Sequence, residues 1–295
     1  MKLGLITPVL TRLPKSHATW EDTAGISEVA RIAMAAEQLG YDHVTCSEHV
    51  AIPTEIVKVR GGTYWDPLSV FGYLSAVTDT IQFATFVLVL GYNHPLEIVK
   101  RYGTLDRVCN SRLILGVGVG SLQEEFDLLG VQFVGRGESG DDALRAIRAS
   151  YGQSEPSYSG SHYSFSGFVI DPVAPRTNVP IWIGGRTGIS LRRAVALGDG
   201  WAPFGLSLEK LNEMLQRARE SEDWNARTSA LEVALQSTPL DPIANPEKTR
   251  EEVAALVDAG MTTLEARFVH HSLGHYIEQL TALRELFPVT SVSSA

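Results

Sequence analysis

The feature that most restricts how this chain can fold is a repeated alternation of short apolar segments with amphipathic ones. Segment 81–90 is too apolar for a strand with one face in water, so it belongs in a sheet covered on both sides. Segment 26–39 instead repeats its apolar residues at helical spacing, and Gly40 is expected to end that helix as a left-handed cap. Alternation with short connections favours parallel strands and right-handed crossovers.

The number of such units predicts the fold class. Strands are expected over 2–9, 41–49, 81–90, the stretch from Arg112, 179–183, 200–204, 231–237 and 262–269. Helices are expected over 26–39, 66–77, 96–108, 140–150, 189–197, 207–221, 246–259 and 273–287. Eight units of this kind close an α/β (β/α)8 TIM barrel, with the polar segment 157–167 as a small hairpin inserted before the fifth strand.

Length and composition agree with one large barrel. The 295 residues are 44% hydrophobic, enough for a full core, and no linker interrupts 1–288, which is predicted to be a single domain with 289–295 as a flexible tail. A net charge of -9 without a Lys/Arg block argues against nucleic-acid and membrane partners. Isolated Cys46 and Cys109, without a signal or spanning segment, predict a cytoplasmic protein. Apolar outer helices such as 96–108 favour a homodimer.

Two glycine turns suggest a ligand site. After the strand from Arg112, Gly116, Gly118 and Gly120 precede a helix start near Leu122, where backbone amides can approach an anion. Alone this pattern is weak, because small residues are also needed where a strand crowds a neighbour. A second strand ends in the same way, with Gly184, Gly185, Arg186 and Thr187 ahead of a helix from Ile189. Two such turns suggest one shared anionic ligand.

The chemistry of a barrel enzyme lies at the carboxyl ends of its strands. The residues expected there are Thr7, Glu48, His49, Asn93, His94, Ser121, Glu124, Arg186, Thr187 and His270 or His271. His49 is the strongest candidate, because imidazole can move a proton near neutral pH. Glu48 is its neighbour, but consecutive strand residues face opposite ways unless the strand ends between them. His43 lies at the other end of the same strand and is expected to be structural.

The sequence lacks the residues that several classes of enzyme reaction require. No lysine falls where a Schiff base would form, and no Gly-x-Ser-x-Gly turn is present. His49, His94 and His270 could in principle bind a metal, but no carboxylate cluster accompanies them, so no metal site is predicted. Anion-binding turns without a protein nucleophile suit an enzyme whose chemistry belongs to a phosphate-bearing cofactor.

The chain resembles the bacterial luciferase-like monooxygenase superfamily, in particular its branch of oxidoreductases dependent on coenzyme F420. The matching blocks are 38–53, 87–95, 105–107 with 112–120, 124–126 and 179–185. The resemblance implies a (β/α)8 barrel with a flavin or deazaflavin at the strand ends. Glu48 and His49 match the acidic residue and histidine beside the ring. Phe86, Val87 and Leu88 match a bulge that often carries a non-prolyl cis peptide. The positions around the phosphate and ribityl chain correspond to Gly118, Gly120, Ser121, Gly184, Gly185, Arg186 and Thr187.

The expected function is hydride transfer between coenzyme F420 and a small organic substrate. An FMN-dependent monooxygenase on the same barrel is the alternative, and a non-catalytic barrel that binds phosphorylated metabolites is an alternative of another class. The sugar-phosphate dehydrogenases of the branch carry a Glu with an acid role where Ser121 stands. We therefore expect neither a sugar-phosphate substrate nor a catalytic acid at this position in this chain. Segments 11–20 and 50–65 are expected to face the substrate, with His17, Trp20, Tyr64 and Trp65 as possible lining residues.

Overall fold

Parallel strands form a closed barrel in the computed structural model, which describes residues 1–14 and 17–288. Its strands are β1 (Lys2–Leu5), β3 (His43–Cys46), β5 (Gln82–Thr85), β7 (Leu113–Gly118), β10 (Ile181–Gly184), β11 (Gly200–Ala202), β12 (Glu232–Leu240) and β13 (Thr263–Phe268). Pairing of β7 with β10, with Leu115 opposite Ile181, closes the ring. The short β6 (Leu88–Val89) continues beside the end of β7. The predicted (β/α)8 barrel is confirmed, while the predicted tail 289–295 lies outside the described residues.

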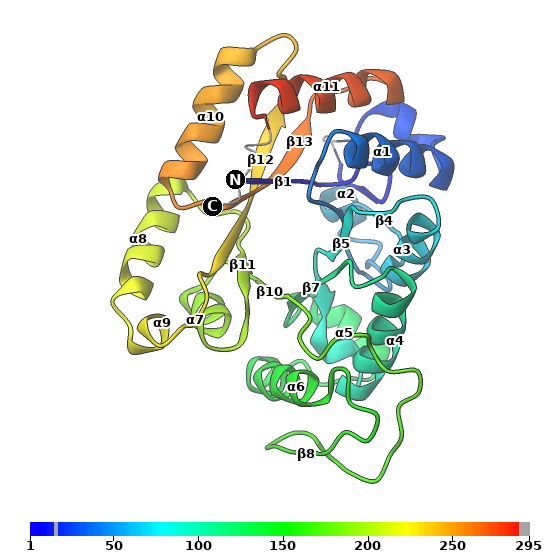
Figure 1. The fold of residues 1–295 in the computed structure, drawn as a ribbon, viewed down its shortest axis with the longest axis vertical. Helices are drawn as coiled ribbons and strands as arrows, with labels where there is room; N and C mark the ends of the chain where they lie inside the picture. The colour runs from blue at the N-terminus through cyan, green and yellow to red at the C-terminus, as the bar shows by residue number, and fades with distance from the viewer. Residues whose placement is uncertain (15–16, 289–295) are drawn as a thin grey trace, which may run out of the picture.

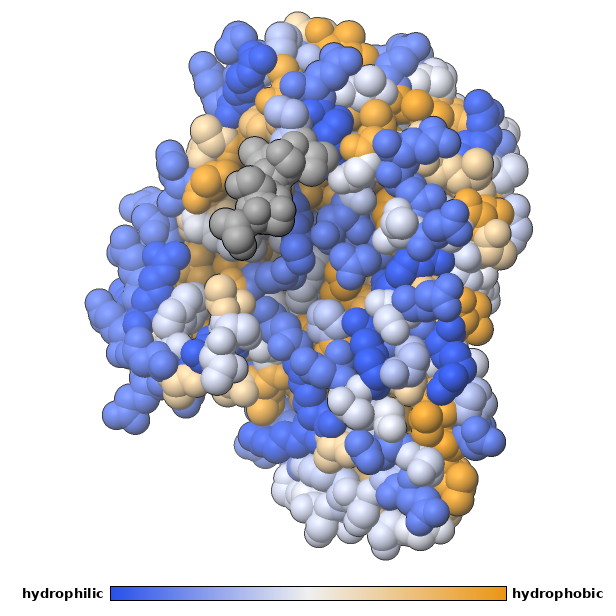
Figure 2. All heavy atoms as spheres, viewed as in Figure 1, coloured by the Kyte–Doolittle hydropathy of each residue, from blue (hydrophilic) through white to orange (hydrophobic). Residues whose placement is uncertain are grey.

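Helices form the outer layer, as Figure 1 shows in a view along the barrel. They are α1 (Ile26–Gln38), α3 (Pro67–Ser75), α4 (Pro95–Val108), α6 (Arg136–Ser150), α7 (Gly188–Leu197), α8 (Leu208–Arg219), α10 (Pro246–Asp258) and α11 (Leu273–Leu286). Shorter helices are α2 (Val57–Arg60), α5 (Gln123–Leu129) and α9 (Glu222–Asn225). Figure 2 shows that the helices present mostly hydrophilic residues on this face. In the described part of the chain, no helix has the length and apolar character needed to cross a membrane.

The amino end of the barrel interior is filled by a polar network. His43 on β3 contacts Glu265 on β13 (Nε2 to Oε1, 2.7 Å) and Asp42 (Nδ1 to Oδ2, 2.9 Å). Although burial opposes protonation, the two carboxylates raise the pKa of His43 to about 10. Gly4 on β1 packs against this ring, and a Cβ there would lie 2.1 Å from Nε2. His43 is therefore a packed structural residue, as the sequence predicted.

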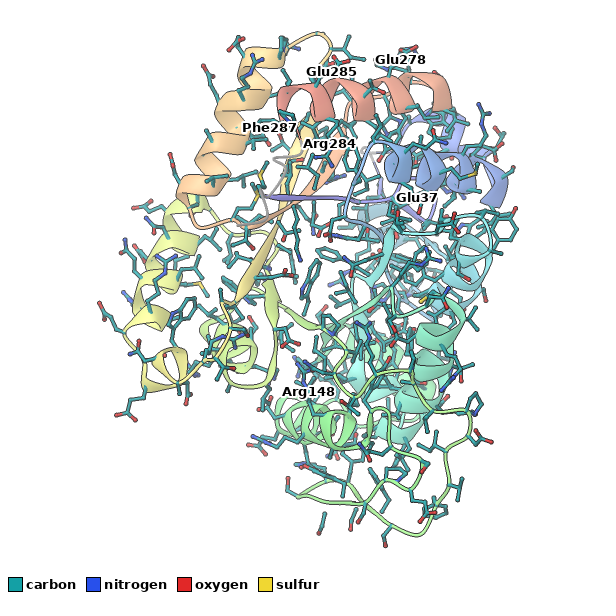
Figure 3. All side chains as sticks on the ribbon, viewed as in Figure 1. Glu37, Arg148, Glu278, Arg284, Glu285 and Phe287 are labelled. Atoms are coloured by element: carbon teal, nitrogen blue, oxygen red, sulfur yellow. The ribbon has the colours of Figure 1, made fainter. Side chains whose placement is uncertain are left out.

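Two arginines on outer helices tie down the loops at the same end of the barrel (Figure 3). Arg148 on α6 donates to the carbonyl oxygen of Val179 at 2.8 Å and to Asp199 Oδ2 at 2.5 Å. Arg284 on α11 donates to the Gly40 carbonyl oxygen, and its guanidinium lies 4.9 Å from the Tyr41 ring centre. These contacts hold the starts of the strands, and the opposite rim is left for a ligand.

The glycines after two helices differ from each other. Gly40 has φ +71°, the left-handed conformation expected of it. Gly198, which follows α7, is instead extended, with φ -111°. A Cβ at Gly198 would lie 2.8 Å from Ile183 Cγ1, so close packing against β10 is the reason for glycine there.

The loops at the carboxyl end contain structure that the sequence did not predict. The short strands β2 (Thr11–Arg12) and β4 (Thr63–Tyr64) pair antiparallel and join the loops after β1 and β3. The predicted insertion hairpin is present as β8 (Tyr158–Ser159) and β9 (Ser164–Phe165). Asp142 on α6 supports this hairpin by accepting hydrogen bonds from the Tyr158 hydroxyl at 2.6 Å and the Tyr163 amide at 2.9 Å.

Candidate active site

A cavity of about 940 Å³ opens at the carboxyl ends of the strands. This volume lies within the range of about 300 to 1,000 Å³ that small-molecule and cofactor sites occupy. Phe86 and Ala202 form an apolar floor of the cavity and pack in a cluster inside the barrel with Ala84, Ile114, Trp182 and Ala234. Of the residues that the family resemblance matches to the ring, phosphate and ribityl positions, all but one line the cavity: Glu48, His49, Phe86, Val87, Gly118, Gly120, Ser121, Gly184, Gly185, Arg186 and Thr187. The exception, Leu88, is fully buried in the wall, and Val89 faces the cavity instead.

The two glycine turns lie side by side, because β7 and β10 are paired strands. Between them sits Val87, and the peptide bond joining Phe86 to Val87 is cis, as the resemblance implied. A Cβ at Gly118 or at Gly184 would lie 3.0 Å from a Val87 methyl group. These glycines therefore accommodate a crowding side chain and also line the cavity, while anion binding by their backbone amides stays a prediction.

The first turn continues through Gly120 and Ser121 into α5. Gly120 has φ +79°, and a Cβ there would lie 2.5 Å from the Phe126 ring, so both conformation and packing require glycine. The Ser121 hydroxyl lies 3.5 Å from both terminal nitrogens of Arg60, a cavity-lining residue of α2 that the sequence did not single out.

The second turn contributes a cap and a free cation. The Thr187 side chain accepts a hydrogen bond from the Ser190 amide at 3.2 Å, so it acts as the N-cap of α7. Among the described residues, the Arg186 guanidinium has no hydrogen-bond or ion-pair partner and lies 5.7 Å from the Phe204 ring centre. Arg186 is thus available to an anion in the cavity.

Glu48 and His49 lie on the same cavity, contrary to the expectation for consecutive strand residues. The predicted strand 41–49 is too long: β3 ends at Cys46, and both residues lie in the loop after it. Glu48 Oε2 accepts a hydrogen bond from the Val89 amide at 2.8 Å. From the sequence, Glu48 and His49 could act together only if the strand ended before them, and β3 does end before them.

His49 is positioned by Glu125, a residue that the sequence analysis did not identify. Glu125 lies on α5 with a fully buried carboxylate, and its Oε2 is 2.7 Å from His49 Nδ1. The same carboxylate accepts hydrogen bonds from the Tyr92 hydroxyl and from the Val50 and Ala51 amides. The His49 ring also contacts Tyr64 edge to face, with ring centres 4.6 Å apart. Neither Glu125 nor the predicted Glu124 beside it lines the cavity. The two residues differ in burial, since Glu125 is buried and Glu124 is exposed.

Burial raises the pKa of Glu48 to about 7, although the Val89 amide opposes the shift. The folded protein therefore keeps this carboxyl protonated up to about pH 7, whereas the unfolded chain releases the proton near pH 4.5. The contribution of the protonated Glu48 carboxyl to the free energy of unfolding is consequently lost as pH rises between these two values, and it does not return above pH 7. Glu48 can donate or accept a proton near neutral pH.

Replacing Glu48 with glutamine should remove this pH dependence. We expect the difference in unfolding free energy between Glu48→Gln and wild type to shift in favour of the variant by about 2 kcal/mol from pH 5 to pH 8. Urea denaturation at the two pH values measures it. Glu55→Gln, at an exposed position of the same loop, is the control. A difference that does not change with pH would show that Glu48 titrates like an exposed glutamate.

The remaining candidates separate into two groups. Thr7, His17, Tyr64 and His270 line the cavity, whereas Asn93, His94, His271, Trp20 and Trp65 do not. Trp20 nevertheless supports the wall, since its indole donates to His270 Nδ1 at 2.9 Å. Within 1–14 and 17–288, no three His, Cys, Asp or Glu side chains are grouped to hold a metal ion.

The fold and the cavity define a class of protein: a (β/α)8 barrel with a cofactor-sized site at the carboxyl rim. A family model described as luciferase-like monooxygenase matches residues 1–288. The chain therefore belongs to the luciferase-like monooxygenase family, whose members are oxidoreductases and monooxygenases.

Three known proteins illustrate the similarity. An uncharacterized protein of Mycobacterium tuberculosis is 29% identical over 269 residues, covering 86% of this chain and 90% of the relative. An F420-dependent glucose-6-phosphate dehydrogenase of Microbacterium testaceum is 28% identical over 181 residues, 60% of this chain and 52% of that enzyme. The structure of 3,6-diketocamphane monooxygenase of Pseudomonas putida in complex with FMN superposes with a TM-score of 0.73 at 15% identity, covering 96% of each chain, and shows the shared fold.

Proposed function

We propose that this protein is an oxidoreductase that transfers a hydride between coenzyme F420 and a small organic substrate. The observation that carries the proposal is the convergence of two glycine turns, an unpaired Arg186 and the Glu48 and His49 side chains on one cavity. The similarity to an F420-dependent dehydrogenase supports this cofactor, and the shared fold with an FMN-containing monooxygenase supports FMN as the alternative. The homodimer and the cytoplasmic location remain predictions.

The cavity fits a phosphate-bearing cofactor. Arg186 supplies a cation without a protein partner among the described residues, and Gly184 and Gly185 line the cavity next to it. Val87 and the apolar floor offer a nonpolar surface suited to a ring system. When bound, the deazaflavin would supply hydride chemistry.

The side chains around the cavity can manage protons and water. Glu48, with its pKa near 7, can exchange a proton with a substrate oxygen. His49 is held through Nδ1 by Glu125, so Nε2 is the nitrogen left for a ligand. Tyr64 and the β2 and β4 strands form part of the wall beside His49, which limits access of water.

The choice of cofactor is testable by direct titration. Fluorescence titrations of the purified full-length chain with F420 and with FMN should show tighter binding of F420. With the reduced cofactor bound, oxygen consumption should be slow. Tight binding of FMN alone, with rapid oxygen uptake, would establish the monooxygenase alternative, and binding of neither would favour a non-catalytic barrel.

Arg186 should contribute to cofactor affinity through its charge. We expect Arg186→Ala to weaken binding of F420 by about 1.5 to 3 kcal/mol, because one charge-assisted contact to phosphate is removed. The fluorescence titration measures this loss. Arg192→Ala, at an exposed position of α7, is a matched control that should bind like wild type. Unchanged affinity of the Arg186→Ala variant for F420 would mean that Arg186 is a solvated side chain that does not contact the cofactor.

A further inference from the structure

The cavity is basic although the chain is acidic. Its lining contains Arg60, Arg136, Arg186, Arg193 and Arg267 against two glutamates, Glu21 and Glu48, in a protein of net charge -9. Charges of one sign in a cleft concentrate ligands of the opposite sign. The excess of arginine therefore points to anionic ligands.

Three of these arginines already have protein partners. Arg60 contacts Ser121, Arg136 donates to the Gly120 carbonyl oxygen at 3.0 Å, and Arg193 pairs with Asp141. Arg186 is assigned above to the cofactor. The guanidinium of Arg267 has no hydrogen-bond or ion-pair partner within the described residues. A half-buried cation without a partner is costly, and ligand-binding sites commonly retain such groups.

Arg267 lies on the far side of the cavity from the glycine turns. Along the closed sheet, β13 is separated from β10 by β11 and β12, and from β7 by β1, β3 and β5. On β13, Glu265 points into the barrel toward His43, and side chains two residues apart share a face, so Arg267 occupies the next interior level above it. An anion at Arg267 would therefore be distinct from one held at Arg186.

Two further polar groups on this side of the cavity have no partner within residues 1–14 and 17–288. Tyr276 lines the cavity with 1% of its surface exposed, and its buried hydroxyl forms no hydrogen bond with any of these residues. Gln236 on β12 lines the same wall, and its side-chain amide has no partner in the described part of the chain. Both groups can donate to an oxygen anion.

In the described part of the chain, no carboxylate forms an ion pair with Arg267. Burial lowers the pKa of Arg267, while nearby Glu21 and Tyr276 act in the opposite direction. The Glu21 carboxylate oxygens accept hydrogen bonds from the Val9 and Ala18 amides at 2.8 and 2.7 Å, and Glu21 acts on Arg267 only through its charge. His270 is neutral at physiological pH, since burial lowers its pKa to about 4.

We propose that Arg267, with Tyr276 and Gln236, binds a carboxylate of the organic substrate on the β13 side of the cavity. One planar guanidinium flanked by a hydroxyl and an amide suits a planar carboxylate better than a phosphate dianion, for which a second cation would be expected. That the bound carboxylate belongs to a substrate rests on the proposed function, whereas the binding site itself rests only on these three residues.

Benzoate and its neutral analogue benzamide are suitable probes. Each is titrated calorimetrically into the full-length protein with its cofactor bound, so that Arg186 is already engaged. Wild type should bind benzoate at least about tenfold more tightly than benzamide. Arg267→Gln should abolish this preference, and Arg267→Lys should retain part of it. Tyr276→Phe, which removes an unpaired hydroxyl without disturbing the fold, should weaken benzoate binding several-fold and leave benzamide unchanged.

The outcomes separate this site from the cofactor site. Equal binding of the two probes to wild type, or an unchanged preference in both Arg267→Gln and Tyr276→Phe, would overturn the proposal. A loss of F420 affinity in Arg267→Gln would assign Arg267 to the carboxylates of the cofactor and would also overturn it. If neither F420 nor FMN binds, the same titrations on the protein alone apply: an Arg267-dependent preference would keep the carboxylate site while the proposed function fails.

Discussion

Replacing His49 with alanine is expected to lower turnover by about 100-fold or more while the fold survives. His49 lies at the cavity wall with one ring nitrogen fixed by Glu125, so its removal takes away a positioned hydrogen-bonding and proton-transferring group without leaving a hole in the core. Turnover is followed by the absorbance of the cofactor identified by titration, with the substrate that wild type accepts, and circular dichroism checks the fold.

His162→Ala is the control for this experiment. His162 is exposed on the insertion hairpin and lies outside the cavity lining, so its variant should turn over like wild type. Wild-type turnover by His49→Ala would exclude a role for His49 in catalysis or in positioning the reactants.

The second large effect is expected on stability, from Glu125→Ala. Four donors share the buried Glu125 carboxylate: the His49 ring, the Tyr92 hydroxyl and the Val50 and Ala51 amides. Truncation leaves these donors without their acceptor, and breaking a buried polar network of this kind costs about 3 kcal/mol. Urea denaturation of the variant and wild type at neutral pH measures the loss.

Glu124→Ala provides a matched comparison for Glu125→Ala. Glu124 is the neighbouring residue on α5 and is exposed, so its truncation should change the unfolding free energy by less than about 0.5 kcal/mol. Equal effects of the two substitutions would mean that the loss comes from removing a negative charge in the first turn of α5 and not from the carboxylate network.

The architecture was predictable because it depends on periodic burial. Segments such as 81–90 and 26–39 differ in hydrophobic period, and that difference alone distinguishes a covered parallel strand from an outer helix. The strand ends were predicted less accurately. The strand predicted over 41–49 ends at Cys46, and the prediction missed this end because the local sequence carries no strong stop signal there. The end of that strand decides whether Glu48 and His49 share a face.

The site was predictable where a residue type has few other uses. The glycine turns, Arg186 and His49 stand out by identity and by their place after strands, and the structure gathers them on one cavity. Glu125, Arg267 and Tyr276 did not stand out, because a glutamate in a helix or an arginine in a strand has many ordinary roles. Their importance appears only through partners or the absence of partners.

By itself, then, the sequence determined the barrel, the rim that carries the site and the turns at two of its strands, since burial period and glycine are local properties of the chain. Only the tertiary structure decided that Glu125 holds His49 across 76 positions of sequence and that Arg267 faces the cavity with no partner among the residues the structure describes. Those facts depend on which side chains meet after the ring of strands has closed, and no local pattern encodes such meetings.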